Sequence, residues 1–228
     1  SAEIIRPILR GRDIKRYGYQ FADLYLICTF PSRNYDIEDF PAIKKHLLTF
    51  GYERLEQSGK TYIVNGEKII ARKKTINKWF ETQDSISYWD DFSKQKIMYP
   101  NMTKYLPFYL DTHGFYQNDK SFFITGSHLS FLCAFLNSSL FKYCFSNNFP
   151  ELQGGTRELR KIFFDKIPIM KVDDSIEKSF NQLVIEIQKK KILNDNPSEI
   201  EHEIDNLLVD IYHLSTEEKS QIGFIEVL

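Results

Sequence analysis

Cysteine is scarce in this sequence, and its spacing excludes the sites that usually depend on it. The 228 residues contain three cysteines, Cys28, Cys133 and Cys144, and none forms a Cys-x-x-Cys pair. Zinc sites and dithiol redox centres require such paired spacing. The cysteines lie in apolar runs such as LYLICTF and FLCAFL. This setting predicts buried thiols in a reducing compartment, and we expect a cytoplasmic location.

The short motifs of common catalytic sites are also missing. The sequence has no Gly-x-Gly-x-x-Gly pattern, no phosphate-binding loop and no His-Glu-x-x-His. The nearest approach to a metal-dependent nuclease is Asp210 with Glu217-Glu218-Lys219, but the stretch Ser215-Thr216-Glu217-Glu218 matches a capped, solvated helix start far better. We therefore expect no catalytic residue, no metal site and no cofactor in this chain, and keep a nuclease as the weakest alternative.

Long hydrophobic runs are absent as well. The longest apolar stretch, SHLSFLCAFLNSSLF, is interrupted by His128, Ser130 and Asn137 and is too short to cross a bilayer. The N-terminus has neither an initiator methionine nor the features of a signal peptide. We expect no membrane partner, and we expect the chain to be a piece of a longer protein.

Charge is plentiful but unevenly distributed. The net charge is only −1, yet residues 173–228 contain 5 Lys and Arg against 13 Asp and Glu, and residues 1–172 contain 25 against 18. The first part therefore has a net charge of +7 and the last part −8. A basic part joined to an acidic part indicates a nucleic-acid partner for the basic part.

The pattern along the chain predicts a mixed α+β fold with flanking helices and a twisted, mostly antiparallel or mixed sheet. Strands are expected in 3–9 and 19–30, a Pro-led helix from Pro41, a hairpin around Asn65-Gly66 and a group of strands over 95–126. One buried helix is expected over 127–149, with Ser127 as its N-cap. Residues 173–228 then predict a helical hairpin. We expect residues 3–172 to form one domain, with 173–228 packing on it.

Three basic clusters remain, and all of them lie next to turns or hairpins. We regard them as the candidate DNA-binding residues, because Arg and Lys hold phosphates, Arg, Asn and Gln bond base edges, and glycine turns let the backbone approach phosphate. The first cluster is assigned mainly to phosphates, and Arg72, Lys73, Lys74, Asn77, Gln153 and Arg157 to positions nearer base edges. The clusters comprise Arg6, Arg10, Arg12, Lys15 and Arg16; Arg72, Lys73, Lys74, Asn77 and Lys78; and Gln153, Gly154, Gly155, Arg157, Arg160 and Lys161.

Taken in order, these segments resemble a known family. The matching stretches are RPILRGRDIKRYG, LYLI, FPAIKKHLLTF, KKTINKWFETQDS, FSKQKIMYPNMT, FLCAFLNSSLFKY, GGTRELRKIFFDKIPI and EIDNLLVDIYHLSTEE. The chain is similar over nearly its whole length to the TaqI-like C-terminal specificity domain of type II adenine-specific DNA methyltransferases and restriction-modification enzymes, mostly of the type IIG and Eco57I-like kinds. The segment TYIVNGEKII departs from the family pattern as a local insertion.

The resemblance implies a target-recognition domain that reads double-stranded DNA, while catalysis lies upstream in the same protein. The chain lacks the Asn-Pro-Pro-Tyr type of tetrapeptide and the S-adenosylmethionine motif of such enzymes. The resemblance thus places adenine N6 methylation, S-adenosylmethionine and any cleavage activity in covalently linked domains outside this chain. A stand-alone specificity subunit that binds a separate methyltransferase is the alternative.

Overall fold

The computed structural model describes residues 2–224, and their contacts divide into two compact units. Unit 1 consists of residues up to Pro7 and Tyr25–Asp90, and unit 2 consists of Ile8–Leu24 and Asp91 onward. Strand β1 (Ile5–Leu9) contributes to both units. Its first residues pair antiparallel with β4 (Tyr25–Ile27) inside unit 1, and Ile8 and Leu9 pair parallel with β10 (Tyr116–Gln117) inside unit 2.

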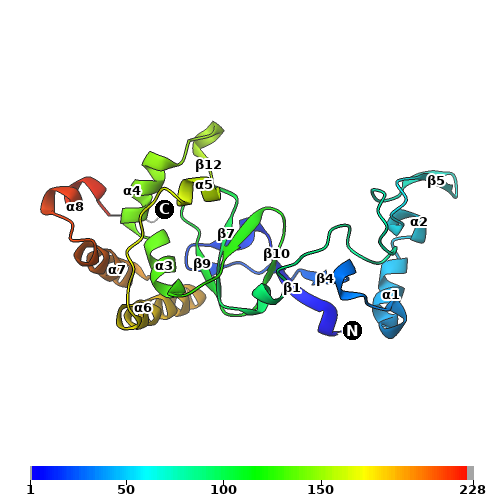
Figure 1. Ribbon diagram of the computed structural model, residues 1–228, viewed down its shortest axis with the longest axis horizontal. Helices are drawn as coiled ribbons and strands as arrows, with labels where there is room; N and C mark the ends of the chain where they lie inside the picture. Colours follow the sequence, from blue (N-terminus) through cyan, green and yellow to red (C-terminus); the bar gives the residue numbers. More distant parts are fainter. Residues whose placement is uncertain (1, 225–228) are drawn as a thin grey trace. The chain divides into compact units, whose positions relative to one another are not determined.

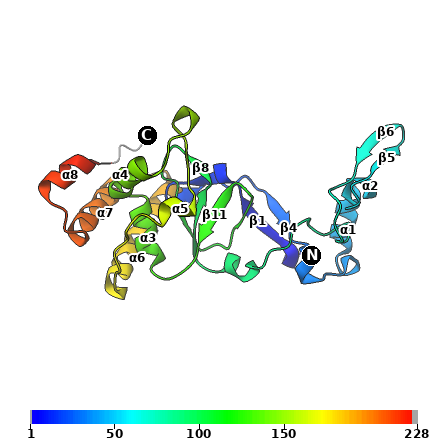
Figure 2. The same ribbon diagram turned by 45° about the horizontal axis from the view of Figure 1, so that its top comes forward.

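Unit 1 is small and has its own apolar core. Ile4, Ile37, Phe40, Ile43 and Phe80 are buried together in it. Figure 2 shows the predicted Asn65-Gly66 hairpin as two paired strands beside the second helix of this unit. Both turn residues have positive φ, which is the geometry of a tight two-residue hairpin. The remaining elements are α1 (Pro41–Leu48), α2 (Tyr52–Leu55), β5 (Thr61–Val64) and β6 (Glu67–Ile70), with short 3-10 turns at Ala2–Ile4, Pro31–Arg33 and Ile37–Asp39.

Unit 2 combines short strands with the longer helices. Its elements are β2 (Ile14–Lys15), β3 (Gly18–Tyr19), β7 (Lys96–Pro100), β8 (Met102–Thr103), β9 (Tyr109–Asp111), β10, β11 (Ser121–Ile124), α3 (Leu129–Leu136), α4 (Ser139–Asn148), β12 (Arg157–Glu158), α5 (Lys161–Phe164), α6 (Asp174–Leu193), α7 (Ser198–Ile211) and α8 (Thr216–Ile222). The central sheet has the order β11-β7-β9 and is antiparallel. Two-stranded pairs, β12-β8 and β2-β3, flank it. The predicted mixed α+β class is confirmed.

The strand β7 is completely buried and carries an internal ion pair with β9. Lys96 Nζ lies 2.5 Å from Asp111 Oδ2 and 2.8 Å from the Phe92 carbonyl oxygen, and neither ionic side chain is exposed. Asp111 also accepts the backbone N–H groups of His113 and Phe115. The pKa of Lys96 is lowered, because the loss of hydration outweighs the attraction of Asp111. The pair fixes the two strands and the turn after β9.

The C-terminal helices complete the core of unit 2, and the predicted helical hairpin is confirmed as α6 and α7 (Figure 1). Phe180, Val184 and Ile187 of α6 and Ile204 of α7 belong to the same buried cluster as α3. The ring of Phe180 meets Phe131 of α3 edge-on, with 5.2 Å between the ring centroids. The acidic segment therefore packs on the basic part of the chain. The division into a domain of residues 3–172 and a C-terminal segment of residues 173–228 stays a prediction.

The single buried helix expected over 127–149 is wrong, because the chain forms two helices there. Ser138 caps α4 by accepting the N–H of Phe141 at 3.1 Å, and its hydroxyl donates to the Phe135 carbonyl. The side-chain amide of Asn137 accepts the N–H of Phe108 and donates to the Phe108 carbonyl. Both side chains satisfy backbone groups at a break between helices.

Ser127 is also not the N-cap of α3. His128 precedes the first helical residue with a left-handed backbone and makes no side-chain cap. The backbone N–H groups of Ser130 and Phe131 have no partner within α3. They donate instead to the two carboxylate oxygens of Glu177 in α6, each at 2.9 Å. A residue 47 positions further along the chain thus supplies the cap.

Candidate nucleic-acid interface

A wide groove lies in unit 2, and its charge is of one sign. It has a volume of about 1050 Å³. No Asp or Glu contributes to its lining within the described residues. Its cationic lining residues are Arg12, Lys15, Arg16, Lys104, Lys120, Lys142, Arg157 and Lys191. A groove with this lining attracts a polyanion and concentrates its own electrostatic field.

Six separate segments place these cations around one groove. The turn and strands of residues 11–20, the corner after β7 at residues 100–107, the turn at Lys120, helix α4, strand β12, and the end of α6 each supply part of the wall. Gly11 makes this packing possible. A Cβ at this position would lie 2.4 Å from the carbonyl oxygen of Lys120, so only glycine lets the two segments touch.

Four of the cations carry unneutralised charge. Arg12, Lys104, Lys142 and Lys191 form no ion pair and no side-chain hydrogen bond within residues 2–224. Lys15 donates to the carbonyl oxygen of Arg12 at 2.8 Å, which leaves its positive charge uncompensated. These side chains are the ones best placed to bind phosphate.

Three arginines that the sequence suggested as DNA ligands hold the protein itself. Arg16 bonds the carboxylate of Glu201 and, at 2.6 Å, the carbonyl of Asn137, and its side chain is 16% exposed. Arg157 donates to the Phe149 carbonyl and to Glu151. The guanidinium of Arg10 donates two hydrogen bonds to the carboxylate of Asp13, at 2.8 and 2.9 Å. The pKa of Asp13 is lowered chiefly by this hydrogen bonding. Arg10 lies outside the groove lining.

The rest of the third cluster lies mostly at the surface. Gly154 and Gly155 have positive φ in an exposed 3-10 turn with Gln153, and of these three only Gly155 reaches the groove. Arg160 pairs with Glu158 at 2.7 Å, and Lys161 pairs with Asp165 at 2.7 Å. Both are solvent-exposed pairs, which contribute little to stability.

The second cluster belongs to unit 1, and two of its members have structural roles. Arg72 donates to the backbone carbonyls of Leu55, Trp79 and Glu81. Asn77 donates to those of Thr82 and Gln83. By contrast, Lys73, Lys74 and Lys78 are exposed. Arg6, on β1, is also part of unit 1. The structure therefore brings part of the first cluster and part of the third to one groove and assigns the second to a different unit. The members that line the groove are Arg12, Lys15, Arg16, Gly155 and Arg157.

Sequence reasoning missed half of the groove's cations. Lys104, Lys120 and Lys142 each lie far from other Lys or Arg residues in the sequence, and Lys191 lies in the acidic part of the chain, so none belongs to the three basic clusters. Lys120 also pairs with Asp119 at 2.8 Å. A usable signal existed only for Lys191, which ends the Lys run at the C-terminus of α6. The others follow from the fold alone.

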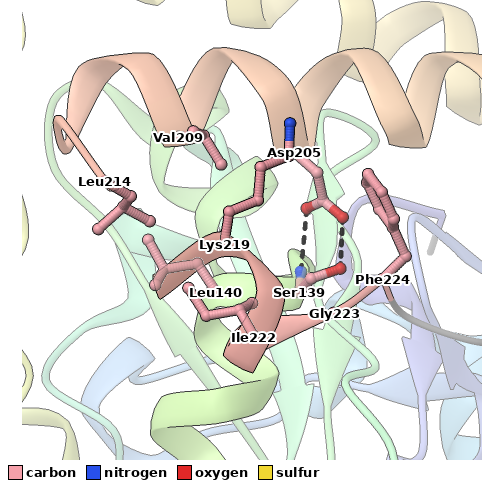
Figure 3. A pocket seen from close by; sticks show the side chains of 9 residues that line it. All are labelled: Ser139, Leu140, Asp205, Val209, Leu214, Lys219, Ile222, Gly223 and Phe224. Carbon is pink, nitrogen blue, oxygen red and sulfur yellow. Dashed lines mark hydrogen bonds between the residues drawn. The ribbon is translucent and has the colours of Figure 1, made fainter. Parts of the chain in front are cut away.

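Two further features serve structure. A hollow of about 30 Å³ between α4, α7 and α8 has a mainly apolar wall, and at its edge Asp205 accepts the N–H and hydroxyl of Ser139 (Figure 3). Of the acidic residues that suggested a nuclease, Asp210 lies in α7, and Glu217 and Glu218 lie in the first turn of α8. There Glu218 forms the predicted capping box with Ser215, and Lys219 donates to Asn206.

Comparison with known proteins identifies the family. Residues 6–169 match the model of the TaqI-like C-terminal specificity domain, and the chain belongs to this family. Over 232 residues it is 22% identical to the type II methyltransferase M.BstVI of Geobacillus stearothermophilus. The match covers 98% of this chain and 36% of that methyltransferase, so the chain spans about a third of its relative. The resemblance found in the sequence is thereby confirmed, and it places the chain among restriction-modification specificity domains.

The structure also bears on membrane association. No helix within residues 2–224 combines the length and the apolar composition that crossing a bilayer requires.

Proposed function

We propose that this chain is the DNA-recognition domain of a type II restriction-modification enzyme, and that the unit 2 groove holds the duplex. The observation that carries the proposal is the groove's lining, which within the described part of the chain includes eight Lys and Arg residues and no Asp or Glu. Binding of phosphates by such side chains releases counterions from DNA, which supplies much of the affinity.

Side chains able to read bases lie among the cations. Asn101 and Gln20 line the groove, and neither side-chain amide has a hydrogen-bond partner within residues 2–224. The backbone of Asn101 is fixed on both sides, since its N–H donates to Lys120 and its carbonyl accepts from Leu159. An amide held in this way can bond adenine N6 and N7 in the major groove. Tyr105, 62% exposed, adds an aromatic face at the rim.

The finer part of the proposal concerns the whole protein. Catalytic domains outside this chain would transfer the methyl group of S-adenosylmethionine to adenine N6 after the base leaves the helix. The residues of this chain would hold and orient the duplex during that step. The relative is named a type II methyltransferase and the match covers only 36% of it, which supports a linked catalytic domain.

Selection from a pool of random duplexes tests the recognition function. The 228-residue chain is expected to enrich one short motif. Asn101→Ala should relax the preference at one position by roughly 1–3 kcal/mol, with affinity for unrelated DNA retained, because a bidentate base contact carries discrimination of that size. Gln182→Ala, an exposed amide on α6 outside the groove, is the matched control. Absence of any enriched motif would contradict sequence recognition.

A further inference from the structure

A loop of unit 1 holds one apolar side chain entirely in water. Ile76 has a relative exposure of 103%, the largest among the exposed large hydrophobic residues of the described chain. Lys73, Lys74 and Lys78 lie close to it in the sequence, and all three are exposed. Isolated surface isoleucines are ordinary in themselves. The way this loop is built makes the position of Ile76 informative.

The loop is fixed from beneath by a buried glutamine. Gln57, 5% exposed, donates to the carbonyls of Lys78 and Glu81 at 3.0 and 2.9 Å and accepts the hydroxyl of Thr75 at 2.7 Å. The N–H of Thr75 also donates to the Gln57 carbonyl at 3.0 Å. The residue before Ile76 is thus held by both the side chain and the backbone of Gln57.

Further bonds complete the frame around Ile76. Arg72 reaches three carbonyls, and the pKa of its guanidinium is lowered by the burial that this requires. Asn77, the next residue after Ile76, donates at 3.0 and 2.9 Å to the carbonyls of Thr82 and Gln83. The buried carboxylate of Glu81 accepts the N–H of Lys78 at 2.7 Å. Networks of satisfied buried polar groups rigidify the backbone that they hold.

Apart from Ile76, the exposed side chains of this loop are lysines. Lys73 and Lys74 form no ion pair or side-chain hydrogen bond within residues 2–224. The backbone of Lys74 packs against Gly59, where φ is +68° and a Cβ would lie 3.4 Å from Lys74. Lys78 Nζ bonds the Tyr35 carbonyl at 3.2 Å, so its positive charge stays uncompensated. The loop presents a rigid apolar tip among positive charges.

We propose that Ile76 is a wedge that inserts between adjacent base pairs of a DNA duplex, while Lys73 and Lys74 bind the phosphates beside it. The proposal rests on the proposed DNA-binding function and adds a second contact element to it. Apolar side chains that enter between base steps unstack them and unwind or kink the duplex. Charge complementarity selects this occupant, since an apolar protein surface would have to desolvate the neighbouring ammonium groups.

Unwinding of closed circular DNA tests the wedge. Plasmid is relaxed by a topoisomerase in the presence of the 228-residue chain, and the change in linking number is measured against the amount of protein bound. The unaltered chain is expected to unwind the plasmid. Ile76→Ala should lose most of the unwinding per bound molecule and keep the salt dependence of binding. Ile192→Ala, 73% exposed on α6, is the matched control and should unwind normally.

The lysines give an independent readout. Lys73→Ala with Lys74→Ala should flatten the salt dependence of binding by about two units of slope, one for each lost phosphate contact. Binding without unwinding, or equal unwinding by Ile76→Ala and the unaltered chain, overturns the wedge and leaves the DNA-binding function standing. Loss of binding to a methyltransferase domain in Ile76→Ala, with unwinding unchanged, overturns it in favour of a protein contact. Absence of any plasmid binding by the unaltered chain refutes the proposed function itself.

Discussion

At the scale of single residues, the partners of each arginine decide its role. Arg10, Arg16 and Arg157 all belong to sequence clusters that suggest phosphate binding, yet each is held by a carboxylate or carbonyl of the protein. Arg12 has no such partner within residues 2–224 and faces the groove. The sequence could not separate these cases, because the partner of Arg16 is Glu201, 185 residues away.

The Arg10–Asp13 pair predicts a pH dependence of stability. Because the folded-state pKa of Asp13 is lowered, the carboxylate contributes stability that is present above its unfolded pKa of about 4 and is lost as pH falls through the folded value. In Asp13→Asn, the free energy of unfolding should therefore fall less steeply as pH drops below about 4 than in the unaltered chain.

Urea unfolding at a series of pH values measures this effect. Asp119→Asn, which removes an exposed carboxylate paired with Lys120, is the control and should follow the unaltered chain closely. Parallel curves for Asp13→Asn and the unaltered chain would show that the pair does not contribute to acid stability.

At the scale of elements, the acidic C-terminal helices stabilise the helices that they cover. Glu177 of α6 caps the N-terminus of α3, and Asp205 of α7 caps that of α4. Carboxylates at helix N-termini satisfy free N–H groups and interact favourably with the helix dipole. Part of the acidic character of this segment thus serves the interior of unit 2.

The cap predicts a stability difference between two residues of α6. Glu177→Ala should lower the free energy of unfolding by about 1–2 kcal/mol, since two N–H groups of α3 lose their partner. Glu186→Ala, exposed on the same helix, should change it by less than about 0.5 kcal/mol. Chemical denaturation of both variants measures the difference, and equal losses would show that the cap does not stabilise α3.

Local patterns made most elements predictable, and contacts between distant segments explain the rest. The Asn65-Gly66 hairpin, the helix led by Pro41 and the capping box at Ser215 follow from neighbouring residues alone. The break at Asn137 does not, because its side chain bonds the backbone of Phe108, 29 residues earlier in the chain. The sequence predicts that a basic surface exists but not which residues form it, since four of the groove's eight cations lie outside the sequence clusters.

At the scale of the whole molecule, the division of charge acquires a spatial meaning within unit 2. Within the acidic segment, Glu177 and Asp205 cap the N-termini of two helices, and Glu201 pairs with Arg16. Lys191 of the same segment lines the groove. Five of the eight groove cations form no ion pair within residues 2–224, namely Arg12, Lys15, Lys104, Lys142 and Lys191. A nearly neutral chain can in this way present a strongly cationic surface to DNA.

The salt dependence of duplex binding tests this account most directly. Removing Arg12, Lys104 and Lys142 together, each changed to Ala, is expected to flatten the slope of log K against log salt by about three units. Replacing Lys166, Lys171 and Lys178 by Ala removes the same charge outside the groove and should leave the slope close to that of the unaltered chain. An unchanged slope in the groove variant, or equal flattening in both variants, would contradict the groove as the DNA-binding surface.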